Sequence, residues 1–250
     1  MRLPNVHGMI RRRLLVNFRV DPVVMQKLLP SPFRPKLHSG YAIAGICLIS
    51  LDNIRPQHVP ECFGIKSENA AHRVAVEWDD IGGIRSGVYI NRRDTGSVLN
   101  RFAGGRLFPG EHHRAMFRVE DDGMKVALQM ASADGNTQID IAGRSAEELP
   151  HSSIFRSIGQ ASTFFESGSL GYSPTRGGNH FDGLSLQTKF WTVAPFKVDH
   201  LLSSYFADRT RFPEGSIDFD CALVMRNIPH VWSSAAELHT LPTPCSQGSC

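Results

Sequence analysis

The sequence lacks the features that would place the protein in a membrane or direct its export. None of its apolar runs approaches the roughly 18 residues of a transmembrane helix. The apolar segment after the basic residues 11–13 is too short for a signal peptide, because Asn17, Arg19 and Asp21 interrupt it. We therefore expect a cytoplasmic protein with no membrane partner.

An excess of one charge and paired cysteines are also missing. The chain has 27 basic and 24 acidic residues, whereas nucleic-acid-binding proteins gather basic side chains on one face. We interpret its densest basic run, residues 11–13, as a solvated strand edge. No CxxC pair occurs among the five cysteines, and Cys47 and Cys221 in apolar runs are expected to be reduced core thiols. We expect no nucleic-acid partner, no metal and no cofactor.

Signatures of nucleotide binding and of familiar hydrolases are absent or incomplete. The P-loop and GxGxxG spacings do not occur, and no serine lies in a nucleophile-elbow pattern. Asp94-Thr95-Gly96 matches the tripeptide of aspartic proteases, but it occurs once, and that site needs two carboxylates that share a proton. We interpret it as a turn or helix cap, in which a salt bridge from the preceding arginines keeps the pKa of Asp94 low.

Apolar patterns predict a protein built mostly of strands. Residues 12–20 end in strand-like alternation, and residues 41–51 form an uncharged apolar run that is typical of a central strand. Residues 133–136 are predicted to be the turn of a hairpin. Further predicted strands cover residues 72–78, 87–91, 115–120, 126–130, 138–142, 184–193 and 217–225.

Helices are predicted to be few and short. Asp21 before Pro22 indicates a helix start, which Pro30 would end. Residues 153–166, with a serine cap, and 198–206 are also predicted to be helical.

The remaining segments are predicted to be irregular. The Gly/Ser/Pro-rich stretch 167–183 is typical of loops that form lids or rims, and residues 233–250 are expected to be a flexible tail. No βαβ rhythm, internal repeat or linker appears. We therefore expect one mainly β (α+β) domain over residues 1–250, with its core at about 12–228, built as an antiparallel barrel or sandwich.

The densest cluster of chemically versatile side chains is Glu111-His112-His113-Arg114. Adjacent strand residues point to opposite faces, so one of the two histidines can face a given pocket, and Glu111 would share a face with His113. A carboxylate beside an imidazole can exchange protons with a substrate, although the same pair facing solvent is simply polar. Spaced third and fourth ligands are missing, so a zinc site is not predicted here.

Three stretches of the sequence carry a resemblance when they are taken together. They are residues 15–22 continuing through 28–30, residues 89–94 running on to 108–113, and residues 201–208 ending with 218–220. In this order they resemble the acetoacetate decarboxylase-like superfamily. The resemblance covers about residues 12–228 and implies a cone-shaped, largely antiparallel β-barrel around a pocket, usually in oligomers.

The resemblance also implies where chemistry would take place. In the decarboxylase itself, two adjacent lysines follow a proline in the second stretch, and one of them forms a Schiff base with a β-keto acid. In this sequence, Pro109 is followed by Gly110, Glu111 and the two histidines, with no lysine nearby. The chain therefore resembles the uncharacterised branch of the superfamily that lacks the lysine pair.

Two main hypotheses follow for function, and both expect a small-molecule ligand and a homo-oligomer. In the first, a lyase-type enzyme binds a small carbonyl or carboxylate metabolite, with acid–base catalysis by Glu111, His112 and His113 and ligand contacts from Tyr89, Arg92, Arg93 and Arg114. In the second, the protein is a non-catalytic module that holds a small metabolite, which the absence of a complete nucleophile–base pair favours. In a third and more remote reading, Lys189 in an apolar segment is a relocated Schiff-base nucleophile.

Overall fold

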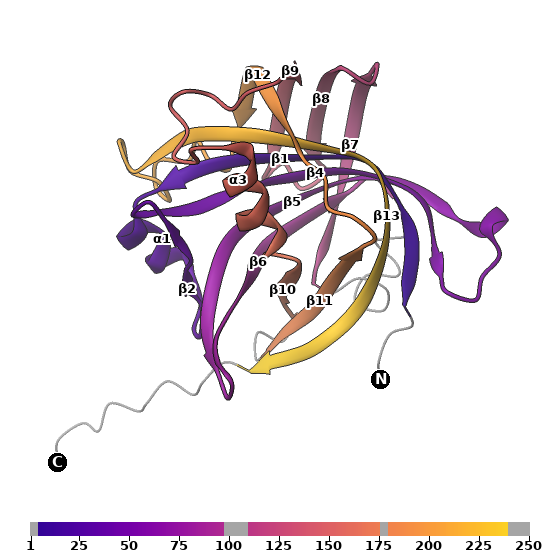
Figure 1. The fold of residues 1–250 in the computed structure, drawn as a ribbon, viewed down its shortest axis with the longest axis horizontal. Helices are drawn as coiled ribbons and strands as arrows, with labels where there is room; N and C mark the ends of the chain where they lie inside the picture. The colour runs from indigo at the N-terminus through magenta and orange to yellow at the C-terminus, as the bar shows by residue number, and fades with distance from the viewer. Residues whose placement is uncertain (1–4, 98–109, 176–179, 240–250) are drawn as a thin grey trace.

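Strands make up most of the computed structural model, which describes residues 5–97, 110–175 and 180–239 (Figure 1). They form a 13-stranded sheet, and this confirms the predicted mainly β fold with short helices. The helices are α1 (Pro22–Leu28), η1 (Glu61–Phe63) and α3 (Ile158–Glu166). The strands are β1 (Val6–Val20), β2 (Arg34–Pro35), β3 (Leu37–His38), β4 (Tyr41–Pro56), β5 (Ile65–Asp80), β6 (Gly83–Thr95), β7 (His112–Asp121), β8 (Lys125–Ser132), β9 (Gln138–Ser145), β10 (Leu170–Pro174), β11 (His180–Thr188), β12 (Ala194–Ser203) and β13 (Ile217–His239).

The sheet closes on itself twice because two strands change partners along their length. β6 pairs with β10 through residues 88–89 and with β7 through residues 93–95, in both cases in parallel. β13 pairs with β12 through residues 222–224 and with β11 through residues 230–239. The smaller ring is therefore β6-β10-β11-β13-β1-β4-β5, and the larger ring replaces β10 and β11 with β7, β8, β9 and β12.

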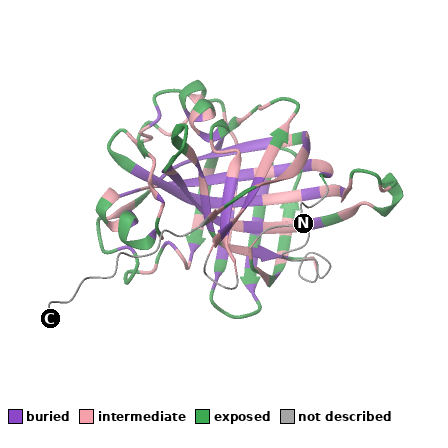
Figure 2. Cartoon of the chain, turned by 90° about the horizontal axis from the view of Figure 1, so that it is seen from below, coloured by how far each residue is buried: buried purple, intermediate pink, exposed green. Residues whose placement is uncertain are grey.

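The long strands shared by the rings are apolar because both of their faces are buried. On β1, Leu14 and Val16 face the large core of the molecule, whereas Leu15 packs on the other side with residues of α3. The central strand predicted at residues 41–51 is confirmed as part of β4, which is buried from Ala42 to Leu48. Figure 2 shows the buried residues along these strands and the exposed residues mostly at the turns. Arg13, two residues before Leu15, faces the same side as Leu15.

The predicted start of the first helix is confirmed by its cap. One carboxylate oxygen of Asp21 accepts hydrogen bonds from the backbone N–H groups of Val23 (2.8 Å) and Val24 (3.0 Å). Pro22 occupies the first turn, where its missing N–H is not needed. The turn at residues 133–136 likewise joins β8 to β9 as an antiparallel hairpin.

Asp21→Ala is expected to lower the free energy of unfolding by about 1 kcal/mol, because both capped N–H groups lose their acceptor. Urea unfolding followed by circular dichroism measures this difference. Asp21→Ser keeps an oxygen acceptor and is the matched control, for which most of the stability should be retained. Equal losses in both variants would show that the cap is not the cause.

Two helix predictions need correction. Residues 198–206 were expected to be helical, but most of them belong to β12, which pairs with β9. The helix expected at residues 153–166 begins at Ile158, with Ser157 as its cap. Ser153 instead donates its hydroxyl to the buried carboxylate of Asp220 at 2.8 Å, which holds residues before the helix against β13.

The predictions of irregular structure are also partly wrong. The stretch 167–183 contains β10 and the start of β11, which complete the smaller ring. Residues 233–239 extend β13, while residues 240–250 lie outside the described part of the chain. Among the described residues, no helix has the length and apolar character needed to cross a membrane. The single domain and the homo-oligomer stay predictions.

Candidate functional site

A cavity of about 120 Å³ lies inside the smaller ring. This is about ten times the space that one water molecule needs. Every strand of that ring contributes to its wall, and His112 at the start of β7 joins them. Most of the wall is apolar, with side chains that include Ile49, Leu51, Val88, Ile90, Leu184, Leu186 and Trp232.

Three guanidinium groups, those of Arg13, Arg73 and Arg93, line this cavity, and each donates a hydrogen bond to a side chain other than a carboxylate. Each also has a buried nitrogen without a hydrogen-bond partner in the described structure. The side chain of Arg73, whose residue is 4% exposed, lies over the ring of Phe165. The acceptors are Cys47 Sγ for Arg13 (3.2 Å), Asn17 Oδ1 for Arg73 (2.6 Å) and Ser173 Oγ for Arg93 (3.2 Å).

None of these three arginines has a carboxylate partner. All aspartates and glutamates of the chain fall within the described residues, and none of them forms an ion pair with Arg13, Arg73 or Arg93. Asp94 lies at the cavity wall, but Arg92 binds its carboxylate through contacts of 2.7–3.1 Å. The cavity therefore carries positive charge that the protein itself does not neutralise.

The cavity arginines stay charged at neutral pH despite their surroundings. Removal from water lowers the pKa of Arg73 to about 10 and the pKa of Arg93 to about 10. Both values are well above 7, so the guanidinium form dominates. Arg73 is buried, whereas Arg13 and Arg93 are half-buried, and a fully buried charge without a counterion costs several kcal/mol.

His112 adds a neutral group to the same cavity. It is the register partner of Arg93, because β6 and β7 pair in parallel at this point. Removal from water and the charge of Arg93 lower the pKa of His112 to about 3. The imidazole is therefore uncharged at pH 7, and it contributes hydrogen bonding rather than charge.

The structure divides the predicted acid–base cluster between two sides of the sheet. Arg93 and His112 line the cavity, whereas His113 Nδ1 lies 3.2 Å from a carboxylate oxygen of Asp134. Arg92 binds that same carboxylate at 3.0 Å. Glu111 precedes β7 and is exposed. The expected Glu111–His113 pair is thus replaced by a His113–Asp134 pair.

The other predicted site residues lie away from the cavity. Tyr89 points into the aromatic core, with its ring 5.4 Å from that of Phe33, and burial raises the pKa of Tyr89 to about 12. Arg114 is exposed and lines an open surface groove. Lys189 follows β11 and is exposed, so the apolar strand position expected for a Schiff-base lysine is wrong.

A sequence profile of the family DUF2071, described as an uncharacterized conserved protein, matches residues 8–216. The chain belongs to this family. No curated protein sequence matches it at a significant level.

Solved structures of acetoacetate decarboxylase-like proteins have the same fold. Acetoacetate decarboxylase from Legionella pneumophila subsp. pneumophila str. Philadelphia 1 aligns with a TM-score of 0.55 and 12% identity, over 94% of this chain and 88% of its own. An acetoacetate decarboxylase-like enzyme from Sphingomonas wittichii RW1 gives 0.55 and 13%, over 94% of each chain. The enduracididine biosynthesis enzyme MppR, complexed with the condensation product of pyruvate and imidazole 4-carboxaldehyde, gives 0.57 and 10%, over 95% and 89%. The predicted fold of this DUF2071 member is therefore confirmed.

Arg13 and Arg73 were not expected at the site of this DUF2071 protein. The interpretation of residues 11–13 as a solvated strand edge is wrong, because β1 lies between β4 and β13. Arg12 is 2% exposed and binds Glu68 at 2.7 Å. A signal was present in the sequence: Arg13 directly precedes the apolar run Leu14-Leu15-Val16, and Arg73 lies between Ala71 and Ala75 on its face of the strand.

Proposed function

We propose that this protein binds a small organic anion, a carboxylate with a short apolar body, in the cavity of the smaller ring. The observation that supports this most strongly is the convergence of Arg13, Arg73 and Arg93 on one cavity without any carboxylate partner. Guanidinium groups bind carboxylates through paired, charge-assisted hydrogen bonds. An anionic ligand would compensate the charge that these arginines bring to the cavity wall.

The rest of the cavity wall favours an apolar body for that ligand. Val88, Leu184 and Trp232 are among its apolar lining residues, and each buried methylene contributes about 0.8 kcal/mol. A volume of about 120 Å³ restricts the ligand to a few carbon atoms beyond the carboxylate. Short carboxylic, 2-oxo or 3-oxo acids meet both requirements.

The similar structures agree with this class of ligand. MppR has been solved as a complex with pyruvate, and also with a condensation product of pyruvate. Pyruvate is a short 2-oxo carboxylate. The present proposal rests on this chain's own arginines, and the MppR complexes add a precedent for such ligands within the fold.

Ligand binding has more support than catalysis through an imine or through Glu111. No lysine is found in the cavity wall among the described residues, and all lysines of the sequence are described. His112, with a pKa of about 3, is a weak proton acceptor near pH 7. We therefore propose a binding function, in which His112 donates a hydrogen bond to the ligand or accepts one from it.

Isothermal titration calorimetry with matched acids and amides tests the proposal. Acetate, propionate, butyrate, pentanoate and pyruvate are titrated beside the corresponding amides. We expect the acids to bind, the amides not to bind, and the affinity to rise about fourfold for each methylene until the cavity is full. Arg114→Met, which removes an exposed arginine, is the control and should bind as the unaltered protein does. Equal binding of amides and acids, or no binding by folded protein at millimolar concentrations, would refute the proposal.

A further inference from the structure

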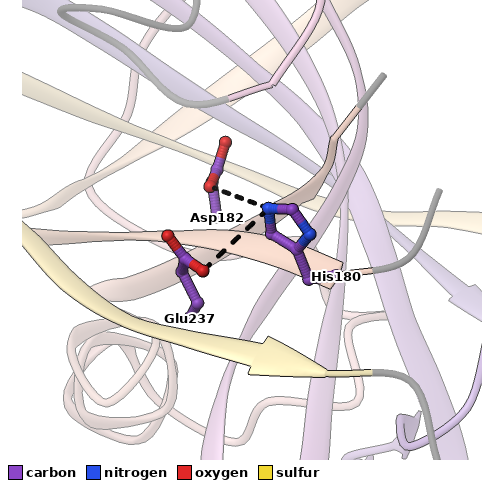
Figure 3. A group of neighbouring side chains, drawn as sticks. All are labelled: His180, Asp182 and Glu237. Atoms are coloured by element: carbon purple, nitrogen blue, oxygen red, sulfur yellow. Dashed lines mark ion pairs between the residues drawn. The ribbon is translucent and has the colours of Figure 1, made fainter. Parts of the chain in front are cut away.

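A second group of polar side chains lies where β11 pairs with β13, outside the cavity wall (Figure 3). His180 and Asp182 are two residues apart on β11 and share a face, and Glu237 projects from β13 toward them. His180 Nε2 lies 4.0 Å from Asp182 Oδ1 and 4.0 Å from Glu237 Oε2. One donor atom from each residue lies within 4.8 Å of the others.

The pairing of these strands places two carboxylates opposite each other. The register pairs Phe181 with Leu238 but Gly183 with Ala235, so a bulge sets Glu237 and its neighbour against Asp182. Like charges directly opposite on a sheet destabilise the pairing.

Within the part of the chain that the structure describes, the surroundings of the two carboxylates supply no permanent positive charge. In the described structure, no lysine or arginine forms an ion pair with either Asp182 or Glu237, and His180 is their shared ion-pair partner. Two facing carboxylates beside an imidazole form an arrangement that favours a cation.

We propose that His180, Asp182 and Glu237 bind a divalent transition-metal cation of the Zn²⁺ type that links β11 to β13. One imidazole nitrogen and two carboxylate oxygens form a donor set that Zn²⁺ accepts, at about 2.0–2.2 Å from each atom. Such bonds need donor atoms about 3–3.6 Å apart, so the donor atoms must move together from present separations of 4.0 Å at His180 and up to 4.8 Å within the group. His180 and Asp182 are each about one-third exposed, at 35% and 31%, so an ion can reach them.

The site has a structural consequence because β11–β13 pairing closes the smaller ring. The same two strands supply Leu184, Leu186 and Trp232 to the cavity wall. A cation bound across them stabilises this closure. The inference does not depend on the proposed anion binding, since none of the three ligands lines the cavity.

Calorimetric and thermal-shift titrations of the full chain with Zn²⁺, after removal of metals by EDTA and desalting, test the inference. We expect one tight Zn²⁺ site per chain, a higher melting temperature on binding, and no response to Mg²⁺, which prefers six oxygen ligands. Glu237→Gln and Asp182→Asn should each weaken Zn²⁺ binding by at least about tenfold. Neither variant should lower the melting temperature of the metal-free protein, because each substitution removes a contact between like charges.

A matched control identifies where the metal binds. His200 Nε2 lies 3.8 Å from Asp140 Oδ1, a histidine–carboxylate pair with no second carboxylate against it in the described structure. Asp140→Asn is therefore expected to leave Zn²⁺ binding unchanged. Absence of a tight site in the unaltered protein, or equal Zn²⁺ affinity in the unaltered, Glu237→Gln and Asp182→Asn proteins, would overturn the inference.

Discussion

Arg93→Met is expected to weaken carboxylate binding by at least about 30-fold while leaving the unliganded protein at least as stable as before. Removing one partner of a buried charge pair costs about 2–5 kcal/mol of binding free energy, and 2 kcal/mol corresponds to about 30-fold in Kd. Calorimetric titration with the tightest-binding acid of the series measures the first effect. Urea unfolding without ligand measures the second.

The expected gain in stability follows from the surroundings of Arg93. Its guanidinium donates to the neutral hydroxyl of Ser173, and one of its terminal nitrogens is buried without a partner in the described structure. Methionine has a similar reach, carries no charge, and packs well against irregular apolar walls. In Arg93→Met, the unliganded protein no longer carries an uncompensated charge and is stabilised. The complex lacks one contact to the anion and is weakened.

Arg92→Met is the matched control, since Arg92 is adjacent in sequence but has its charge compensated. Its partner Asp94 is 0% exposed, and burial outweighs the arginine and raises the pKa of that carboxyl. The earlier expectation of a low pKa for Asp94, in a turn or cap, is wrong because Asp94 lies within β6 and is removed from water. Arg92→Met leaves Asp94 without its partner and should cost about 3–5 kcal/mol. Equal destabilisation by both variants would make Arg93 a structural residue and remove the main support for the proposed function.

The strands were predictable because their apolar pattern is local, while their partners are not. The uncharged run of β4 indicates a strand buried on both faces whatever its neighbours are. Residues 198–206 have apolar side chains at spacings that also fit a helix. Most of this segment instead forms strand β12, because it pairs with β9, which is far away in the sequence. The double closure of the sheet depends on β6 and β13 each exchanging one partner for another, and no local pattern specifies that exchange.

The same distinction explains what the sequence revealed of the site. Strand alternation implies that His112 and His113 face opposite sides. Whether an arginine is compensated depends on distant acids: Asp134 lies against Arg92, while no carboxylate pairs with Arg93. The metal inference has the same origin, since Asp182 and Glu237 meet through the register of two strands that are far apart in the chain.

Lowering the pH from 6.5 to 4.5 is expected to reduce the free energy of unfolding by about 4 kcal/mol through two buried histidines. Removal from water lowers the pKa of His72 to about 3 and the pKa of His230 to about 4, and the two residues are 0% and 4% exposed. The unfolded chain binds these protons at its ordinary pKa of about 6.5, and the folded chain does not. The stability is therefore fully present above pH 6.5 and is lost as the pH falls toward the folded values, by up to about 1.4 kcal/mol per pH unit for each histidine.

His72→Phe isolates one of the two contributions. Both ring nitrogens of His72 lack a hydrogen-bond partner in the described structure, and its ring centroid lies 4.6 Å from that of Tyr205, so an aromatic hydrocarbon fits the same position. At pH 7 the variant should be as stable as the unaltered protein, and below pH 6.5 its stability should fall less steeply by about 1.4 kcal/mol per pH unit. His151→Phe, at an exposed position, should leave the slope unchanged. Urea unfolding at a series of pH values measures these slopes. An unchanged slope for His72→Phe would mean that His72 takes up its proton in the folded protein, and that water or an anion reaches this part of the core.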